Sequence, residues 1–133
     1  MFAVFCYGTL EFPQVMEAVT GRRFPSISAT LEGYARFLIK NAVYPGIIPA
    51  TGERIDGTLY RNVDPRSMRR LDRYEDSLYV RRAVTVYTCD GQVTEAQTYV
   101  IPRQQRRALS SKLWDRNQFS RHHLKSYLAR LRT

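Results

Sequence analysis

The chain has 133 residues, of which 44% are hydrophobic and 25% charged, and its formal net charge is +9. This length predicts one domain over residues 1–133, which buries ~65–70% of its unfolded surface without metal or disulfide bonds. No apolar run approaches the roughly 20 residues of a membrane span, and the start of the chain lacks the pattern of a secretion signal. We therefore expect a globular cytoplasmic protein.

The chain begins with a short apolar run, residues 2–6, that stops at Tyr7-Gly8-Thr9-Leu10. An apolar run that reaches a glycine predicts a buried strand ending in a sharp bend. Glycine permits positive φ and a close approach of the backbone to a ligand. The N–H groups of Thr9 and Leu10 would lack strand partners and be free to bind a carboxylate or an oxyanion. The alternative is a tight turn that only connects two elements.

Four elements follow: a helix over 12–19, a strand over 26–39, a turn with large apolar side chains over 44–49, and a strand over 54–63. Pro13 suits the first turn of the helix, and Gly21 lies where a C-terminal cap belongs. The strand over 26–39 is expected to bend at Gly33.

The rest of the chain predicts a helix over 65–75, a hairpin with strands 79–89 and 93–101, and a last helix at about 115–131. Asp64 is a typical N-cap residue, and Asp90-Gly91 is a strong hairpin signal. Mostly consecutive, hairpin-prone strands with few helices predict the α+β class. We expect a small mixed, largely antiparallel sheet curled toward a barrel, with peripheral helices.

Both cysteines fall within predicted strands, Cys6 in the first and Cys89 at the end of the hairpin's first strand. Reduced core thiols explain them better than a disulfide in a cytoplasmic protein. No cysteine and histidine cluster has zinc spacing, and no glycine-rich phosphate loop is present, so neither a metal nor a cofactor is expected.

The helix over 65–75 carries a candidate acid. Met68, Leu71, Asp72 and Glu75 fall within roughly a 100° arc, and the Met and Leu mark that arc as the buried side. A desolvated carboxylate at a helix C-terminus has a raised pKa, which suits a general base or acid near neutral pH. The alternatives are a frayed helix end with Glu75 in water or paired to an arginine at 81–82, and Asp72 as the rival acid.

Several segments together resemble the gamma-glutamylcyclotransferase-like superfamily, particularly its avirulence-induced-gene-like branch. In chain order they are residues 5–10, Tyr44-Pro45-Gly46, Gly57-Thr58-Leu59-Tyr60, Leu71-Asp72-Arg73-Tyr74-Glu75, Tyr79-Val80-Arg81, and Trp114 with Phe119 and Tyr127. Each segment alone is unspecific, whereas the ordered set spans nearly the whole chain. Family members often have glycine after the acid, where this chain has Asp76.

The resemblance implies a barrel-like sheet with a cavity at one end. It also implies that the loop formed by Tyr7, Gly8, Thr9 and Leu10 binds a γ-glutamyl group and that Glu75 is the proton acceptor. The expected activity is release of 5-oxoproline from a γ-glutamyl peptide or γ-glutamylamine, without a cofactor. Tyr79 and Arg81 are further candidates for substrate binding, and Arg81 would pair with the substrate's α-carboxylate.

Two other functions remain open. The first is a non-catalytic module that keeps the pocket for a small ligand or a protein segment. The second is nucleic-acid binding through residues 103–132, where nine arginines and lysines accompany the single acid Asp115. Such a segment binds phosphate in a salt-dependent way, but it is more often a solvated helix face, so nucleic acid is not the expected partner.

Overall fold

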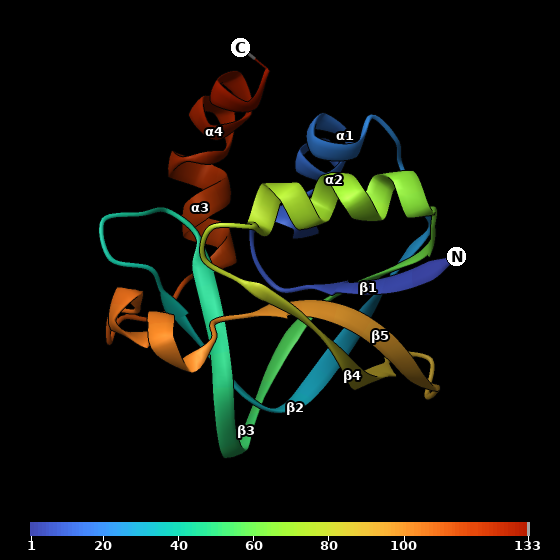
Figure 1. Ribbon diagram of the computed structural model, residues 1–133, viewed down its shortest axis with the longest axis horizontal. Coiled ribbons are helices and arrows are strands. Elements are labelled where there is room, and N and C mark those ends of the chain that lie inside the picture. Colours follow the sequence, from blue (N-terminus) through green and yellow to red (C-terminus); the bar gives the residue numbers. More distant parts are fainter. Residues whose placement is uncertain (133) are drawn as a thin grey trace.

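A computed structural model describes residues 1–132, which form a closed five-strand barrel with helices packed on one side (Figure 1). The strand order is β1-β3-β2-β4-β5. Their bounds are β1 Phe2–Cys6, β2 Ser26–Leu38, β3 Pro45–Val63, β4 Val80–Thr88 and β5 Val93–Val100. All pairs are antiparallel except β1 with β5, which is parallel and closes the barrel. The predicted α+β class with a largely antiparallel, barrel-like sheet is confirmed.

Six helical segments connect or cover these strands. Two are 3₁₀ helices, η1 Thr9–Glu11 and η2 Arg103–Ala108. The α-helices are α1 Pro13–Thr20, α2 Pro65–Glu75, α3 Arg116–His122 and α4 Leu124–Leu131. Helices α1, α2 and α4 gather above β1 (Figure 1). None of the helices within residues 1–132 is long and apolar enough to cross a membrane.

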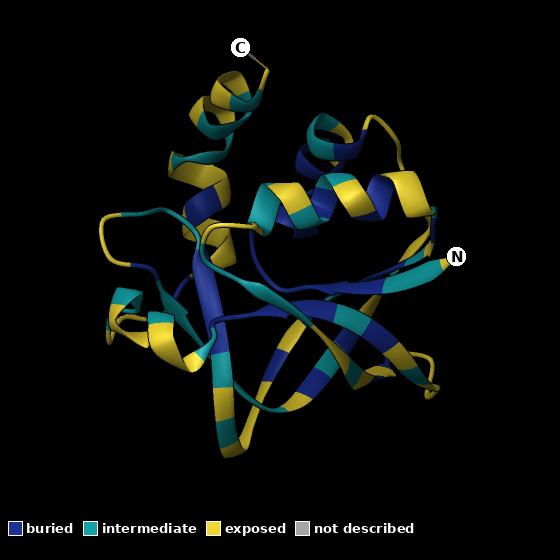
Figure 2. Ribbon diagram, in the orientation of Figure 1, coloured by how far each residue is buried: buried dark blue, intermediate teal, exposed yellow. Residues whose placement is uncertain are grey.

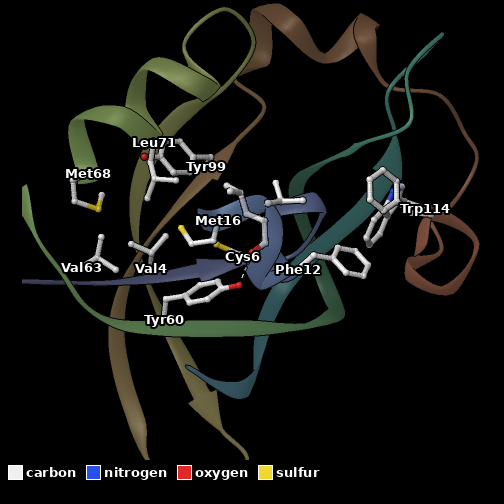
Figure 3. Packing of buried hydrophobic residues seen from close by; sticks show 13 residues of the cluster. Val4, Cys6, Phe12, Met16, Tyr60, Val63, Met68, Leu71, Tyr99 and Trp114 are labelled. Carbon is white, nitrogen blue, oxygen red and sulfur yellow. Dashed lines mark hydrogen bonds between the residues drawn. The ribbon is translucent and has the colours of Figure 1, made fainter. Parts of the chain in front are cut away.

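Two hydrophobic clusters form the core. One fills the barrel and includes Phe5, Ile47 and Leu59. The other lies between the outer face of β1 and β3 and the helices, with Val4 and Tyr60 packed against α1 and α2 (Figure 3). Strand β1 contributes to both clusters because successive side chains point to opposite faces of a strand. It is therefore buried for most of its length, whereas the bend in the middle of β3, residues 51–54, is exposed (Figure 2).

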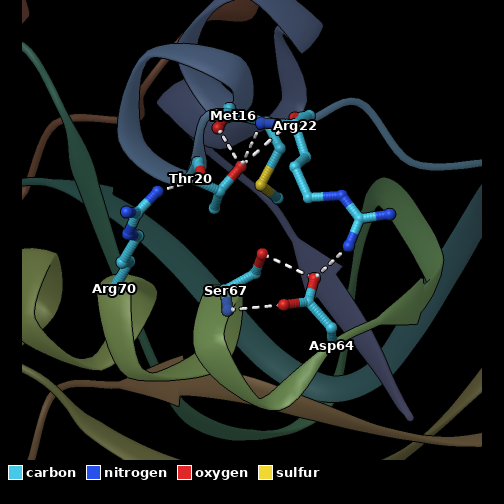
Figure 4. Close-up of polar contacts among 6 residues, drawn as sticks. All are labelled: Met16, Thr20, Arg22, Asp64, Ser67 and Arg70. Atoms are coloured by element: carbon cyan, nitrogen blue, oxygen red, sulfur yellow. Dashed lines mark hydrogen bonds and ion pairs between the residues drawn. The ribbon is translucent and has the colours of Figure 1, made fainter.

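Helix α2, which ends at the candidate acid, is fixed at its N-terminus by polar contacts (Figure 4). The carboxylate of Asp64 accepts hydrogen bonds from the backbone N–H and the hydroxyl of Ser67, at 3.1 and 2.7 Å. Arg22 forms an ion pair with Asp64 at 3.0 Å, and Arg70 donates to the carbonyl of Thr20 at the end of α1. These contacts join α1 to α2 and confirm the predicted N-cap.

The predicted turn over 44–49 is wrong. Strand β3 begins at Pro45, and Ile47 is fully buried inside the barrel. Proline is tolerated at the first residue of a strand, since no ladder hydrogen bond from its nitrogen is then lost. A Cβ on Gly46 would collide with Ile101, so this glycine serves close packing and not a reversal of the chain.

Two further expectations need correction. The last helix is not continuous over 115–131, because it breaks at His123, whose φ of −130° and ψ of −24° are not helical, and so forms α3 and α4. Asp115 still caps the start of α3 by accepting from the backbone N–H of Asn117. Cys89 lies in the turn after β4 and is exposed, not in the core, whereas Cys6 is buried and both thiols are free.

Candidate active site

A cavity of about 170 Å³ opens at the end of the barrel, between the segment after β1 and the end of α2. Among residues 1–132, its walls contain one carboxylate, that of Glu75, and no arginine, lysine or histidine. Six tyrosines dominate the lining: Tyr7, Tyr44, Tyr74, Tyr79, Tyr99 and Tyr127. The segments that supply these residues are far apart in sequence, since they come from β1, β3, α2, β4, β5 and α4 or the residues beside them.

Glu75 is the last residue of α2 and lies in the cavity wall, one turn beyond fully buried Leu71. Its carboxylate makes no hydrogen bond or ion pair with any of residues 1–132, so the alternative pairing with Arg81 or Arg82 is not formed. Burial without a compensating partner raises the pKa of Glu75 to about 8. The neighbouring carboxylate of Asp76 is exposed and does not contribute.

The opposite wall is the segment from Tyr7 to Leu10. Its N–H groups at Gly8, Thr9 and Leu10 donate to no acceptor within the described chain, because they precede or begin η1 and so have no helical partner. The bend does not use positive φ, since φ of Gly8 is −139°. Glycine is needed here because a Cβ would lie 2.8 Å from the ring of Pro45.

Hydrogen bonds between the tyrosines and the backbone fix the walls of the cavity. The hydroxyl of Tyr7 donates to the carbonyl of Tyr99, and that of Tyr79 donates to the carbonyl of Pro45, both at 2.6 Å. Burial, together with the charge of Glu75, raises the pKa of Tyr7 and Tyr79 well above the ordinary value for a phenol. Both hydroxyls therefore remain protonated near neutral pH and act as donors.

A second set of hydroxyls links the loop to the last helix. Tyr74 on α2 bonds to Tyr127 on α4 and also lies 3.3 Å from the hydroxyl of Thr9. Sequence reasoning named Tyr127 as part of the family pattern but did not place it in the site. Its position on the apolar stripe of the last helix was the available signal, because that stripe faces the protein.

Arg81 does not line the cavity. Its Nε lies 3.3 Å from the carboxylate of Asp72, and its guanidinium stacks 5.6 Å from the ring centre of Phe2. Asp72 in turn accepts a hydrogen bond from the hydroxyl of Tyr99 at 2.7 Å. The rival acid is therefore paired, whereas Glu75 is not. Of the sequence candidates, the structure brings together Tyr7–Leu10, Glu75 and Tyr79, and leaves Arg81 outside.

The family follows from sequence comparison. The model of the family described as "Gamma-glutamyl cyclotransferase, AIG2-like" matches residues 4–116. The chain belongs to this family. It is 32% identical over 130 residues to AIG2-like protein D of Arabidopsis thaliana, an alignment that covers 96% of this chain and 85% of that protein. AIG2-like protein C of the same plant is 32% identical over 100 residues, which covers 74% of this chain and 58% of that protein.

Solved structures agree with this fold. A solution structure of a protein from Arabidopsis thaliana superimposes with a TM-score of 0.75 at 26% identity, covering 97% of this chain and 87% of the other. A gamma-glutamyl cyclotransferase superimposes with a TM-score of 0.62 at 14% identity, covering 99% and 86%. The second comparison shows a shared gamma-glutamylcyclotransferase-like fold. The family match contains both walls of the cavity and ends before α4, so Tyr127 lies outside it.

No metal centre is evident in the part of the chain that the structure describes. Residues 1–132 contain no group of three or more His, Cys, Asp and Glu side chains arranged to bind a metal ion. The cavity offers a carboxylate that can transfer a proton, neutral phenols that can donate hydrogen bonds, and backbone N–H groups that can bind an anion.

Proposed function

We propose that this protein is a gamma-glutamylcyclotransferase-like enzyme that releases 5-oxoproline from a γ-glutamyl peptide or γ-glutamylamine. The α-amine of the substrate attacks its own γ-carbonyl carbon and forms the ring C–N bond. The original amide C–N bond breaks, and the amine leaves. This intramolecular attack requires no nucleophile from the protein, since orientation of the substrate supplies much of the rate.

Glu75 would take a proton from the substrate's α-ammonium group and return one to the departing amine. The observation that carries the proposal is its unpaired carboxylate in the wall of the cavity, with a pKa of about 8 caused by burial. A base with a pKa near the working pH transfers protons efficiently in both directions. Asp72 is less suited to this role because Arg81 and Tyr99 occupy its carboxylate.

The free N–H groups at Gly8–Leu10 would bind the substrate carboxylate or the oxyanion that develops on the γ-carbonyl. Backbone N–H groups fixed in advance stabilise such charge strongly in a site that excludes water. Among residues 1–132 no arginine or lysine lines the cavity, so these N–H groups would be the donors that bind the anion. Tyr79 lies beside Glu75 in the same wall and would help to orient the γ-glutamyl group. The free thiols are consistent with a reducing, cytoplasmic setting.

The deciding experiment is an assay for 5-oxoproline with a panel of γ-glutamyl peptides and γ-glutamylamines. Glu75→Gln keeps the shape and polarity of the side chain but removes the base, so we expect kcat to fall by ~10²-fold or more while substrate binding is retained. Asp76→Asn is the matched control, because it removes the adjacent, exposed carboxylate and should leave kcat within about twofold.

Two outcomes would contradict the proposal. Undiminished turnover in Glu75→Gln would remove this residue from the mechanism. If γ-glutamyl compounds raise the melting temperature of the wild-type protein but no 5-oxoproline appears, the protein is a binding module and not an enzyme.

A further inference from the structure

A half-buried arginine contacts the back of the Tyr7–Leu10 loop. Nη1 of Arg36, on β2, donates to the carbonyl of Tyr7 at 2.7 Å, and the arginine lines a different, polar cavity of about 690 Å³. It does not line the tyrosine-rich cavity that contains Glu75, whereas Tyr7 and Gly8 do. Arg36 therefore contacts the loop from the side opposite to the candidate active site.

The hydrogen bond from Arg36 to the carbonyl of Tyr7 also determines the direction of the N–H of Gly8. The Tyr7–Gly8 peptide is trans, as is every peptide bond in the described chain. In a trans peptide the C=O and N–H groups point in opposite directions. Because the carbonyl of Tyr7 points toward Arg36, the N–H of Gly8 points away from it, toward the side on which the loop lines the candidate active site.

Arg36 is itself fixed by several contacts. Its Nη1 also donates to the carbonyl of Asp56 at 3.1 Å, and its guanidinium lies 5.5 Å from the ring centre of Trp114. Nη1 is 4.0 Å from Oε2 of Glu11, whose side chain is only 6% exposed. A planar guanidinium can satisfy a carbonyl, a carboxylate and an aromatic face at once, which a lysine cannot do.

Glu11 connects this arginine to the loop through the chain itself. It is the last residue of η1, which begins at Thr9, and its Oε1 accepts a hydrogen bond from the hydroxyl of Thr58 at 3.3 Å. Burial raises the pKa of Glu11 to about 7, although the charges of Arg116 and Arg36 oppose this shift. A carboxylate buried in this way needs a nearby cation; among residues 1–132, Arg36 lies within 4.0 Å, and the charge of Arg116 also acts on Glu11.

We propose that Arg36 is a positioning residue for the reaction, because it sets the orientation of the Tyr7–Gly8 peptide and so directs the N–H of Gly8 at the substrate. Glu11 is its counter-charge. This inference rests on the proposed function for its catalytic meaning. Arg36 does not touch the substrate, so its effect passes entirely through the loop.

The test compares three variants. Arg36→Gln removes the charged donor, Arg36→Lys keeps the charge but not the planar fork, and Arg54→Gln is the matched control. Arg54 lines the same polar cavity, but its side chain makes no hydrogen bond or ion pair with any described residue. Circular dichroism and the melting temperature establish that each variant is folded before it is assayed.

We expect Arg36→Gln to lower kcat/KM for 5-oxoproline release by roughly 10- to 100-fold, the scale of one lost charged hydrogen bond. Arg36→Lys should fall between Arg36→Gln and the wild type, and Arg54→Gln should stay within about twofold. Because burial alone sets the pKa of Glu75, the pH at which activity is half-maximal should stay the same in Arg36→Gln. A general loss of folded protein would instead lower kcat alone, in proportion to the folded fraction, and leave KM unchanged.

A second measurement does not depend on activity. In ¹H–¹⁵N NMR spectra of the ligand-free protein, the amide resonances of Gly8 and Thr9 should move in Arg36→Gln and remain in place in Arg54→Gln. Unmoved loop amides in a folded Arg36→Gln, or an unchanged kcat/KM, would overturn the inference. If wild-type protein releases no 5-oxoproline, the proposed function fails, and the loop amides alone then decide whether Arg36 orients the peptide.

Discussion

Glu75 lies in an environment that opposes its ionisation. Its pKa is raised to about 8 by burial alone, with no arginine or lysine in the cavity wall to offset the loss of water. The unfolded chain would ionise the same carboxyl near its ordinary value of 4.5. This difference has one consequence for the rate of the proposed reaction and another for the stability of the fold.

The rate should depend on pH through this carboxyl. If Glu75 acts as the base, only its ionised form is active, so kcat/KM should fall roughly tenfold per pH unit as pH drops below about 8. A pH profile of 5-oxoproline release checks this expectation. A profile that stays flat down to pH 6 would mean that another group accepts the proton.

The stability of the fold should depend on pH in the opposite sense. Between pH 4.5 and about 8 the folded protein keeps a proton on Glu75 that the unfolded chain releases, so this carboxyl lowers stability as pH rises. Glu75→Gln removes the charge, and it should be more stable than wild type by about 2 kcal/mol at pH 9 and by little at pH 4. Urea denaturation at both pH values measures the difference. An equal gain in stability at pH 9 and at pH 4 would mean that the substitution improves packing and does not act through the charge of Glu75.

Gly8 is restricted by its neighbour and not by its own φ angle. A Cβ at this position would lie 2.8 Å from both Cγ and Cδ of Pro45, which also begins β3. Gly8→Ala should therefore displace the loop, destabilise the fold by ~1–3 kcal/mol and reduce 5-oxoproline release. Gly91→Ala provides contrast, since nothing lies within 4 Å of its Cβ position, although its φ of +86° adds local strain.

At the scale of elements, η1 depends on a single tyrosine of β3. The buried hydroxyl of Tyr60 lies 2.7 Å from the carbonyl of Leu10 and 3.0 Å from that of Glu11. Tyr60→Phe leaves both carbonyls buried without this donor, so we expect a loss of about 1–3 kcal/mol in the free energy of unfolding. Denaturation of the variant measures this loss. Tyr87→Phe, which changes an exposed tyrosine, should have no comparable effect.

The sequence predicted those elements whose position is determined by residues close together in the chain. Asp64 before Pro65 marked the start of α2. With a rotation of 100° per residue, Met68 and Glu75 lie on nearly the same face of that helix, and this placed the acid on its inner side. The strand predicted over 54–63 is the second part of β3, whereas the first part was missed because Pro45-Gly46 is also a turn signal. The close packing of Gly46 depends on Ile101, which lies more than fifty residues along the chain.

The same limit applies to the candidate site. The loop and Glu75 each carried a recognisable pattern, whereas the contact between Arg36 and the carbonyl of Tyr7 joins residues 29 positions apart with no shared spacing. Arg81 was chosen because it lies near Glu75 in sequence. It instead pairs with Asp72 on α2 and does not line the cavity.

At the scale of the whole molecule, the two thiols differ in their exposure and therefore in their reactivity. Cys89 is exposed in a turn and Cys6 is 4% exposed within the core, so no disulfide joins them. Burial raises the pKa of Cys6 well above its ordinary value, which further lowers its reactivity. We expect an alkylating reagent to modify Cys89 in the native protein and Cys6 only on unfolding, as measured by mass spectrometry. Rapid modification of both in the native protein would contradict this burial.

The charge of the molecule is uneven, and residues 103–132 provide most of it. The cations of this segment that the structure describes are exposed, and the guanidinium groups of Arg116 and Arg130 lie over the rings of Phe12 and Tyr127. We expect this segment to be a solvated surface, with no retardation of duplex DNA or RNA in a mobility-shift titration at about 0.15 M salt. A salt-sensitive shift that persists at that concentration would instead identify a phosphate-binding surface.

The length of β3 restricts where this chain can change length. One strand of 19 residues carries Pro45 beside the loop at one end and Thr58 and Tyr60 behind the loop at the other. An insertion of one residue into a regularly paired part of this strand would turn the side chains that follow it to the opposite face of the sheet. The exposed bend around Gly52 differs, because φ is +84° there and the register with β2 already shifts between Pro49 and Arg54. Added residues at this bend should therefore disturb the pairing of β3 least.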